Sequence, residues 1–110
     1  MAGDGLTLLQ GTLDLMILGV LARGPSHGYG IAEQVRETTT GELNVQDGAL
    51  YQALHRLERQ GLVDAEWGAS DNNRRARYYS LTPKGRRRVR DQAAEWHRYA
   101  RAIATLLKGV

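Results

Sequence analysis

The stretch from Gln46 to Leu81, QDGALYQALHRLERQGLVDAEWGASDNNRRARYYSL, decides the fold. Its first part carries leucines at intervals of four and three, which is the pattern of a helix with one buried face. These leucines are Leu50, Leu54 and Leu57. Two later segments, near residues 63–67 and 77–81, alternate apolar and polar side chains as half-buried strands do, and a polar loop joins them. A helix followed by a hairpin with a basic tip indicates a winged helix, a module that places a helix in a DNA groove.

The exposed side of this helix carries the candidate residues for reading DNA. In a helix-turn-helix, the N-terminal part of the second helix meets the base edges, and here that helix begins near Asp47. The candidates are Tyr51, Gln52 and His55 on this helix, Gln46 immediately before it, and Tyr29 on the preceding helix. An ordinary surface helix is the alternative interpretation of the same segment.

Positive charge is concentrated in one part of the chain, although the net charge is only +3. Residues 74–90 hold eight of the fifteen Lys and Arg residues and no Asp or Glu. This concentration favours a polyanionic partner, while a solvated basic face is the alternative. Because Arg74, Arg75 and Arg77 lie in or beside the hairpin loop, we predict that they contact DNA phosphates.

The N-terminal half of the chain predicts two further helices. Residues 6–21 carry apolar side chains on several faces, so this helix must be covered on more than one side. A breaker rich in turn-forming residues follows, and Ser26 within it is the predicted N-cap of a helix from Tyr29 to Thr38. Leu43 and Val45 alternate with polar neighbours and predict a very short strand.

A long C-terminal helix is predicted from its start signal and its repeat. Thr82 and Pro83 suit the N-cap and the first helical position. After them, apolar residues recur at alternating intervals of four and three, which is the heptad seam of paired helices. The seam comprises Val89, Ala93, Trp96, Ala100, Ile103, Leu107 and Val110. We predict a homodimer through this seam, with Leu9 and Leu13 of the first helix adding to the interface; packing against the chain's own domain is the alternative.

Length and composition restrict the class of protein. A length of 110 residues predicts one compact domain, and the patterns above predict that it is mostly helical with a small β-hairpin wing. Within it we expect a winged-helix DNA-binding domain over residues 1–82, with residues 1–5 disordered, and a dimerisation helix over residues 83–110. No apolar run reaches the roughly 18 residues of a membrane span, and residues 1–5 lack the basic start of a secretory signal. We therefore expect a cytoplasmic protein that does not enter a membrane.

Catalytic and metal-binding patterns are missing from the sequence. The absence of cysteine excludes a disulfide framework and thiolate metal ligands. His27, His55 and His97 do not have metal-ligand spacing, and there is neither a nucleophile elbow nor a glycine-rich phosphate loop after a strand. We expect no enzyme activity, no metal and no cofactor.

Three segments of the chain together resemble the PadR family of bacterial transcriptional regulators. They are LQGTLDLMILGVLARGPSHGYGIAEQV, GELNVQDGALYQALHRLERQGLVDAEW and RRARYYSLTPKGRRRV, and the resemblance extends from about Leu8 to Ala100. The single helix after the wing is similar to the short, LmrR-like subfamily. The resemblance implies a homodimer that binds a pseudo-palindromic operator on double-stranded DNA, usually represses transcription, and is often released by a small aromatic or cationic effector.

The resemblance also implies an effector site at the centre of the dimer. In the short subfamily a tryptophan at this place stacks on drugs, and Trp96 occupies the matching position. Leu15 and Leu18 of the first helix would line the same site. Ala93 and Ala100 replace larger or acidic neighbours there, and a tryptophan that only fills the interface is the alternative.

The opening of the predicted recognition helix departs from the family pattern. Gln46 and Asp47 stand where the family usually has Ser-Pro, and Gln52 stands where it often has Pro after the Tyr. These residues predict a base preference different from that of better known members.

The competing function is a winged-helix interaction module that binds an acidic protein partner without sequence-specific DNA binding.

Overall fold

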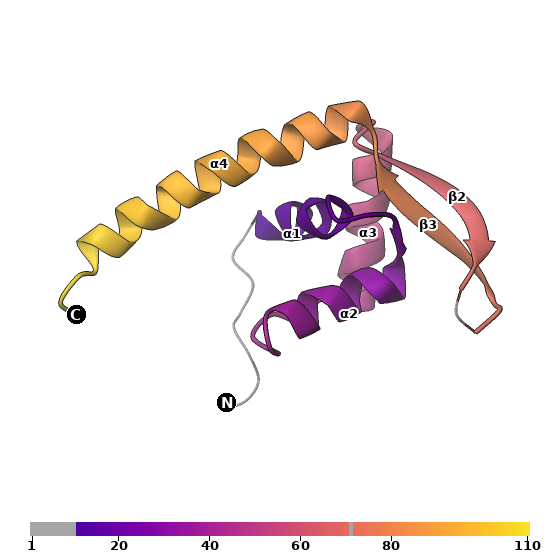
Figure 1. Cartoon of the computed structure of the whole chain (residues 1–110), viewed down its shortest axis with the longest axis horizontal. Helices are drawn as coiled ribbons and strands as arrows, with labels where there is room; N and C mark the ends of the chain where they lie inside the picture. Colours follow the sequence, from indigo (N-terminus) through magenta and orange to yellow (C-terminus); the bar gives the residue numbers. More distant parts are fainter. Residues whose placement is uncertain (1–10, 71) are drawn as a thin grey trace.

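Within residues 11–70 and 72–110, which the computed structural model describes, the chain forms four α-helices and a three-stranded sheet (Figure 1). In order, the elements are α1 (Thr12–Leu21), β1 (Ser26–His27), α2 (Gly28–Thr38), α3 (Asp47–Arg59), β2 (Val63–Ala69), β3 (Arg75–Leu81) and α4 (Pro83–Leu106). In Figure 1, α1 and α2 lie to one side of α3, and the hairpin of β2 and β3 lies to the other. The architecture is a winged helix followed by one long helix, as predicted. None of the helices in the described residues is long and apolar enough to cross a membrane.

The sheet is antiparallel, with β3 between β1 and β2. The hairpin runs in register from the pair Val63 and Leu81 to the pair Ala69 and Arg75. Its turn is closed by the Ser70 N–H, which donates to the Arg74 carbonyl at 2.7 Å. The strands are therefore longer than predicted, and Arg75 begins β3 instead of lying in the loop.

The short strand β1 corrects the prediction that Ser26 caps α2. Ser26 is 6% exposed and pairs with Tyr79 of β3, so it belongs to the sheet. The N-cap is His27, whose Nδ1 accepts a hydrogen bond from the Gly30 N–H at 3.0 Å. An unprotonated imidazole nitrogen accepts the hydrogen bond of a backbone N–H in the first helical turn, as the oxygen of the shorter Ser side chain would.

The predicted strand at Leu43 and Val45 does not form; these residues lie in an irregular segment between α2 and α3. The Leu43 N–H donates to the Thr39 side-chain oxygen at 3.0 Å, so this group is held by a loop contact. Both neighbouring positions of β3 are already taken by β1 and β2. Val45 is half-buried and packs against the core.

The hydrophobic core lies between α1, α2, α3 and one face of the sheet. It comprises Ile17, Leu18, Leu21, Ile31, Leu50, Ala53, Leu54, Leu57, Leu62, Val63, Tyr79 and Leu81. The leucines of α3 that define its periodicity are all within this set, and each fully buried leucine contributes about 1.5–3 kcal/mol of stabilisation. Leu18 is only 1% exposed. Its side chain fills the chain's own core, which corrects the prediction that Leu18 lines an effector site.

The long helix α4 begins as predicted. The Thr82 side chain accepts a hydrogen bond from the Gly85 N–H at 3.0 Å, and Pro83 occupies the first turn. Gly85 is buried against the backbone carbonyl of Leu62. Close to this start, Val89 packs against the core and the helix runs beside α1 (Figure 1).

The far part of α4 leaves the rest of the fold. Residues 101–110 are all exposed in the described chain, and Figure 1 shows this end of α4 projecting beyond α1. The helix ends at Leu106, with Leu107 as its C-cap. Val110 therefore lies beyond the helix, which shortens the predicted heptad seam by its last member.

Candidate nucleic-acid interface

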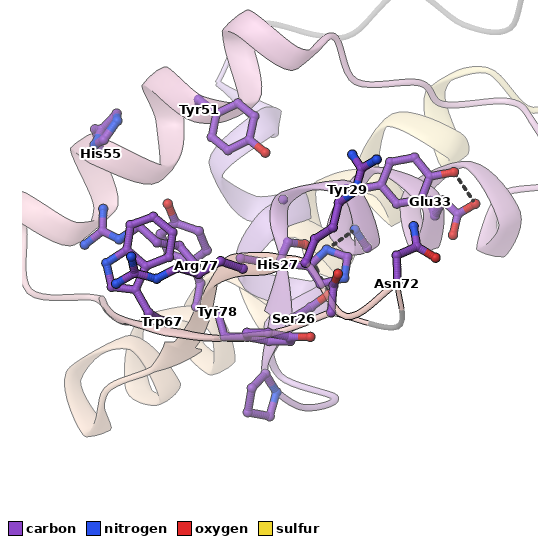
Figure 2. A pocket seen from close by; sticks show the side chains of 18 residues that line it. Ser26, His27, Tyr29, Glu33, Tyr51, His55, Trp67, Asn72, Arg77 and Tyr78 are labelled. Atoms are coloured by element: carbon purple, nitrogen blue, oxygen red, sulfur yellow. Dashed lines mark hydrogen bonds between the residues drawn. The ribbon is translucent and has the colours of Figure 1, made fainter.

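An open cleft separates the exposed side of α3 from the wing and has a volume of about 950 Å³. Its walls come from α3, from the start of α2 and from β2 and β3 with their turn. Six of the eight predicted DNA contacts line it. These six are Tyr29, Tyr51, His55, Arg74, Arg75 and Arg77. Figure 2 shows Tyr51 and His55 extending from α3 on the side opposite Arg77 and Tyr78.

The helical wall of the cleft is built by the spacing of α3. Because Leu50, Leu54 and Leu57 face the core, residues one position later turn away from it. Tyr51 and His55 are one turn apart on this outer side and are both exposed. Gln52 is also exposed and Gln46 is the N-cap of α3, with no side-chain capping bond, but neither lines the cleft.

The three predicted arginines lie on the wing side of the cleft and differ in their exposure and in their ion pairing. Arg74 and Arg75 are exposed, and the Arg75 guanidinium lies 4.4 Å from the ring centroid of Trp67. Arg77 is half-buried and donates from Nη2 to Glu58 Oε2 at 3.1 Å. Within the described residues, Arg74 and Arg75 form no ion pair, so their charges are available to an anionic partner.

Tyr29 and His27 complete the cleft at the start of α2. Tyr29 is 68% exposed, and its hydroxyl donates to Glu33 at 3.1 Å. This hydrogen bond to a carboxylate raises the pKa of Tyr29, so its hydroxyl keeps its proton. The His27 ring lies edge-on to Tyr78, with 5.2 Å between centroids, and stacks beside Tyr29 at 6.4 Å.

Sequence reasoning missed Trp67, Tyr78 and His27 as residues of the cleft. Period-two alternation placed Trp67 on the buried face of its strand, whereas its side chain is 58% exposed. The strand extends past the edge of the core, so Trp67 lies outside the hydrophobic core and its ring is covered on one side by the Arg75 guanidinium. The available signal was Arg75, which lies diagonally across the hairpin from Trp67, close enough for long side chains to meet.

One residue of the basic segment 74–90, Lys84, makes a contact that stabilises the fold. Lys84 in the first turn of α4 donates from Nζ to the Gln60 carbonyl at 2.9 Å. Gln60 is the C-cap of α3, where unpaired carbonyls and the helix dipole favour a cation. Lys84 is therefore used within the chain, unlike the arginines of the hairpin turn.

The predicted interface residues in the described chain are half-buried on α1 and the first part of α4 and exposed near the end of α4. Leu9 lies outside the described residues. Leu13 and Val89 are half-buried against the core, Ala93, Trp96 and Ala100 are half-buried farther along, and Ile103 and Leu107 are 38% and 57% exposed. The Trp96 ring lies 6.2 Å from that of Tyr99, and Leu15 is half-buried on α1.

The fold and the cleft together define a winged-helix, DNA-binding transcriptional regulator. Residues 17–91 match the Transcriptional regulator PadR-like family. This match spans most of the chain, and the chain therefore belongs to the PadR-like family.

Two curated proteins are similar to all or part of the chain. The chain is 23% identical over 103 residues to "Uncharacterized protein X" of Lysinibacillus sphaericus, with 94% of each chain covered. It is 36% identical over 54 residues to "Transcriptional regulator YqjI" of Escherichia coli, covering 49% of this chain and 26% of that protein. The match to YqjI is thus confined to about a quarter of its length.

Solved structures are similar over nearly the whole chain. A transcriptional regulator from Clostridium thermocellum superposes with a TM-score of 0.80 at 28% identity, covering 93% of this chain and all (100%) of that one. A PadR family transcription regulator from Clostridium difficile gives a TM-score of 0.75 at 31% identity, covering 90% of this chain and 100% of that one. The second is named for the family and covers 90% of this chain, so more than half of the 24-residue α4 belongs to the shared fold.

Proposed function

We propose that this chain binds a pseudo-palindromic operator as a homodimer and represses transcription until a small effector releases it. The observation that carries the DNA-binding part is the cleft itself. It gathers six of the eight DNA contacts predicted from the sequence, which come from α2, α3, β3 and the turn before β3. In this proposal α3 enters the major groove, and the turn with the start of β3 places Arg74 and Arg75 beside the phosphate backbone.

Pairing of two copies is supported by the apolar surface of α4. Ile103, Leu106 and Leu107 are 38%, 78% and 57% exposed although they are large and hydrophobic. A helix of 24 residues is about 36 Å long, which exceeds what the chain's own core covers. Two copies joined here would present two recognition helices to half-sites about 34 Å apart, one helical turn of DNA.

An effector site is proposed at Trp96 of α4, with the half-buried Leu15 of α1 as a second lining residue. Trp96 is not fully covered within the described chain, and Tyr99 adds a second aromatic ring. A planar aromatic or cationic molecule would stack on such rings. It would change repression only by binding one arrangement of the two copies more tightly than another.

Membership of the PadR-like family favours DNA over the competing acidic protein partner, because a regulator of transcription acts at DNA. The deciding measurement is a mobility shift with DNA from upstream of the chain's own gene, against an excess of random competitor. The expected result is a retarded band that survives competitor DNA and is lost when Arg74 and Arg75 are both replaced by Ala. Arg23, an exposed arginine outside the cleft, provides the matched control as Arg23→Ala.

Two results would contradict this proposal. Retardation that random DNA removes as easily as the upstream fragment would leave only electrostatic binding. Equal loss of binding in Arg23→Ala would show that total charge matters and the cleft does not.

A further inference from the structure

We propose that Gly28 is a positioning residue for DNA recognition, because its missing side chain leaves the space in which the Tyr51 phenol lies. This inference rests on the proposed function, since it concerns how the cleft distinguishes an operator from other DNA. Gly28 is the first residue of α2 and is buried, whereas Tyr51 belongs to α3 and is 44% exposed. The contact therefore joins the two helices at the floor of the cleft.

The geometry allows no side chain at Gly28 while Tyr51 stays in place. A Cβ atom built there would lie 2.7 Å from Cζ and 2.9 Å from Cε1 of Tyr51, and closer still to its hydroxyl oxygen. Carbon atoms pack at about 3.5–4.0 Å, so even the smallest side chain would displace the ring. Position 28 does not require glycine for a left-handed backbone, because φ at this residue is not positive. The close approach of the Tyr51 ring is thus the reason for glycine here.

The start of α2 cannot move aside to relieve such a contact. Ser26 and His27 pair with Tyr79 and Tyr78 of β3, which holds the turn to the wing. The Gly30 N–H donates to His27 Nδ1 at 3.0 Å, which holds the first turn of α2 to the residue that precedes it. The backbone before and after Gly28 is therefore fixed on both sides, and the ring of Tyr51 must be the part that yields.

The tip of Tyr51 has no other anchor in the described residues. Its hydroxyl makes no hydrogen bond there, although Figure 2 shows it directed from α3 toward the start of α2. The surface of Gly28 is consequently what fixes the position of a free hydroxyl within the cleft. A hydroxyl hydrogen bond spans about 2.5–3.0 Å, so a shift of about 1 Å abolishes it. Gly28 thereby sets which DNA edge Tyr51 can reach.

The test compares Gly28→Ala, Tyr51→Ala and the double variant, using an operator selected from random DNA by the wild-type chain. We expect each single variant to lose about tenfold in operator affinity, as for one base contact, and to keep its affinity for random DNA within about twofold. In the Tyr51→Ala background, Gly28→Ala should change operator affinity by less than about twofold, because the displaced ring is already gone. Gly19→Ala on α1, where an added Cβ meets nothing within 4 Å, is the matched control and should bind as the wild type does.

A DNA-free measurement tests the contact separately. In the wild-type chain, nuclear Overhauser effects should join the Gly28 α-protons to the Tyr51 ring protons, and the corresponding effects should weaken in Gly28→Ala. Thermal melting should stay close to that of the wild type, since a flexible side-chain tip is what moves. Absence of these effects in the wild type would overturn the inference.

The remaining outcomes are also decisive. A tenfold loss from Gly28→Ala that persists in the Tyr51→Ala background would overturn the inference, because Gly28 would then act by another route. Equal losses on operator and random DNA would overturn it as well. A wild-type chain that selects no sequence at all would instead overturn the proposed function, with the Gly28 and Tyr51 contact still measured by magnetic resonance.

Discussion

Arg77 on β3 donates to the carboxylate of Glu58 on α3, with 3.1 Å between Nη2 and Oε2, and so joins the wing to the recognition helix. The Arg77 guanidinium also lies 5.8 Å from the ring centroid of Tyr79. Its charge is thus partly compensated before any DNA arrives, in contrast to the charges of Arg74 and Arg75.

Replacing Glu58 by Gln should strengthen binding to random DNA and make it more dependent on salt. The substitution removes the carboxylate that neutralises Arg77, and one more phosphate contact steepens the logarithmic salt dependence by about 0.9. Fluorescence anisotropy titrations at several salt concentrations measure the slope. Glu42→Gln removes an exposed carboxylate outside the cleft and controls for net charge. A slope that is unchanged in Glu58→Gln would exclude Arg77 as a latent phosphate contact.

Replacing Arg74 and Arg75 together by Ala should weaken binding to operator and random DNA by similar factors. Phosphate contacts position a protein without reading sequence, so the ratio of the two affinities should be preserved. The salt slope should flatten by up to about 0.9 for each lost contact. Titrations of both DNAs over a range of salt give slope and ratio together. An unchanged slope would remove the hairpin turn from the interface.

Gly85→Ala should destabilise the fold by about 1–3 kcal/mol, the cost of overpacking a core. The added Cβ would collide with the Leu62 carbonyl, and that carbonyl is fixed because it accepts a hydrogen bond from the Thr82 N–H at 3.1 Å. Urea denaturation followed by circular dichroism measures the change. Gly19→Ala, on a helix with open space around it, should be neutral or stabilising by up to about 1 kcal/mol. Equal stabilities of the two variants would show that α4 can shift away from Leu62.

Ile103→Glu combined with Leu107→Glu should yield monomers that lose operator binding. Charges placed in an apolar interface repel each other and pay for desolvation, and a single copy reaches only one half-site. Sedimentation equilibrium gives the mass, and a mobility shift gives the binding. Thr105→Glu, an exposed position on a different side of the same helix turn, should remain dimeric. Persistent dimers in the double variant would place the interface elsewhere.

Trp96 fluorescence should respond to aromatic cations or phenolic acids if the proposed effector site exists. The chain has two tryptophans, so the titration uses Trp67→Phe, which leaves Trp96 as the only indole. A ligand that quenches Trp96 should also weaken operator binding, because it selects one arrangement of the copies. No response to any member of the panel would leave Trp96 as a packing residue.

Much of the fold was predictable because its signals are local. The leucine spacing of α3, the Thr82 and Pro83 start of α4 and the alternation in β2 and β3 each lie within a short window. The spacing of apolar residues identifies the buried face of each element, and the structure confirms that Leu50, Leu54 and Leu57 lie in the core. The same patterns also identified most of the predicted residues that gather in the cleft. Side chains of α3 that do not face the core lie on its outer side, and the basic turn lies outside the core as well.

The errors fall where distant contacts decide the outcome. Ser26 and His27 form a strand only because β3 has a free edge about 50 residues away in the chain, and two residues carry no period of their own. Leu18 was assigned to an effector site from the resemblance to the short subfamily, and because its helix is apolar on several sides, spacing alone could not show that Leu18 faces the chain's own core. The role of Gly28 depends on a tyrosine from another helix, which no local pattern contains.

The exposed end of α4 makes the proposed regulator sensitive to its own abundance. Residues 101–110 have little of their own chain to pack against, so their burial would depend on encounter with a second copy. While most chains are single, mass action makes the amount of paired protein rise with the square of the total, and a twofold increase in chains gives about fourfold more pairs. Transcription under such control would switch over a narrower range of protein level than a one-chain regulator permits. The length of a single helix would thus set the dose at which the gene is turned off.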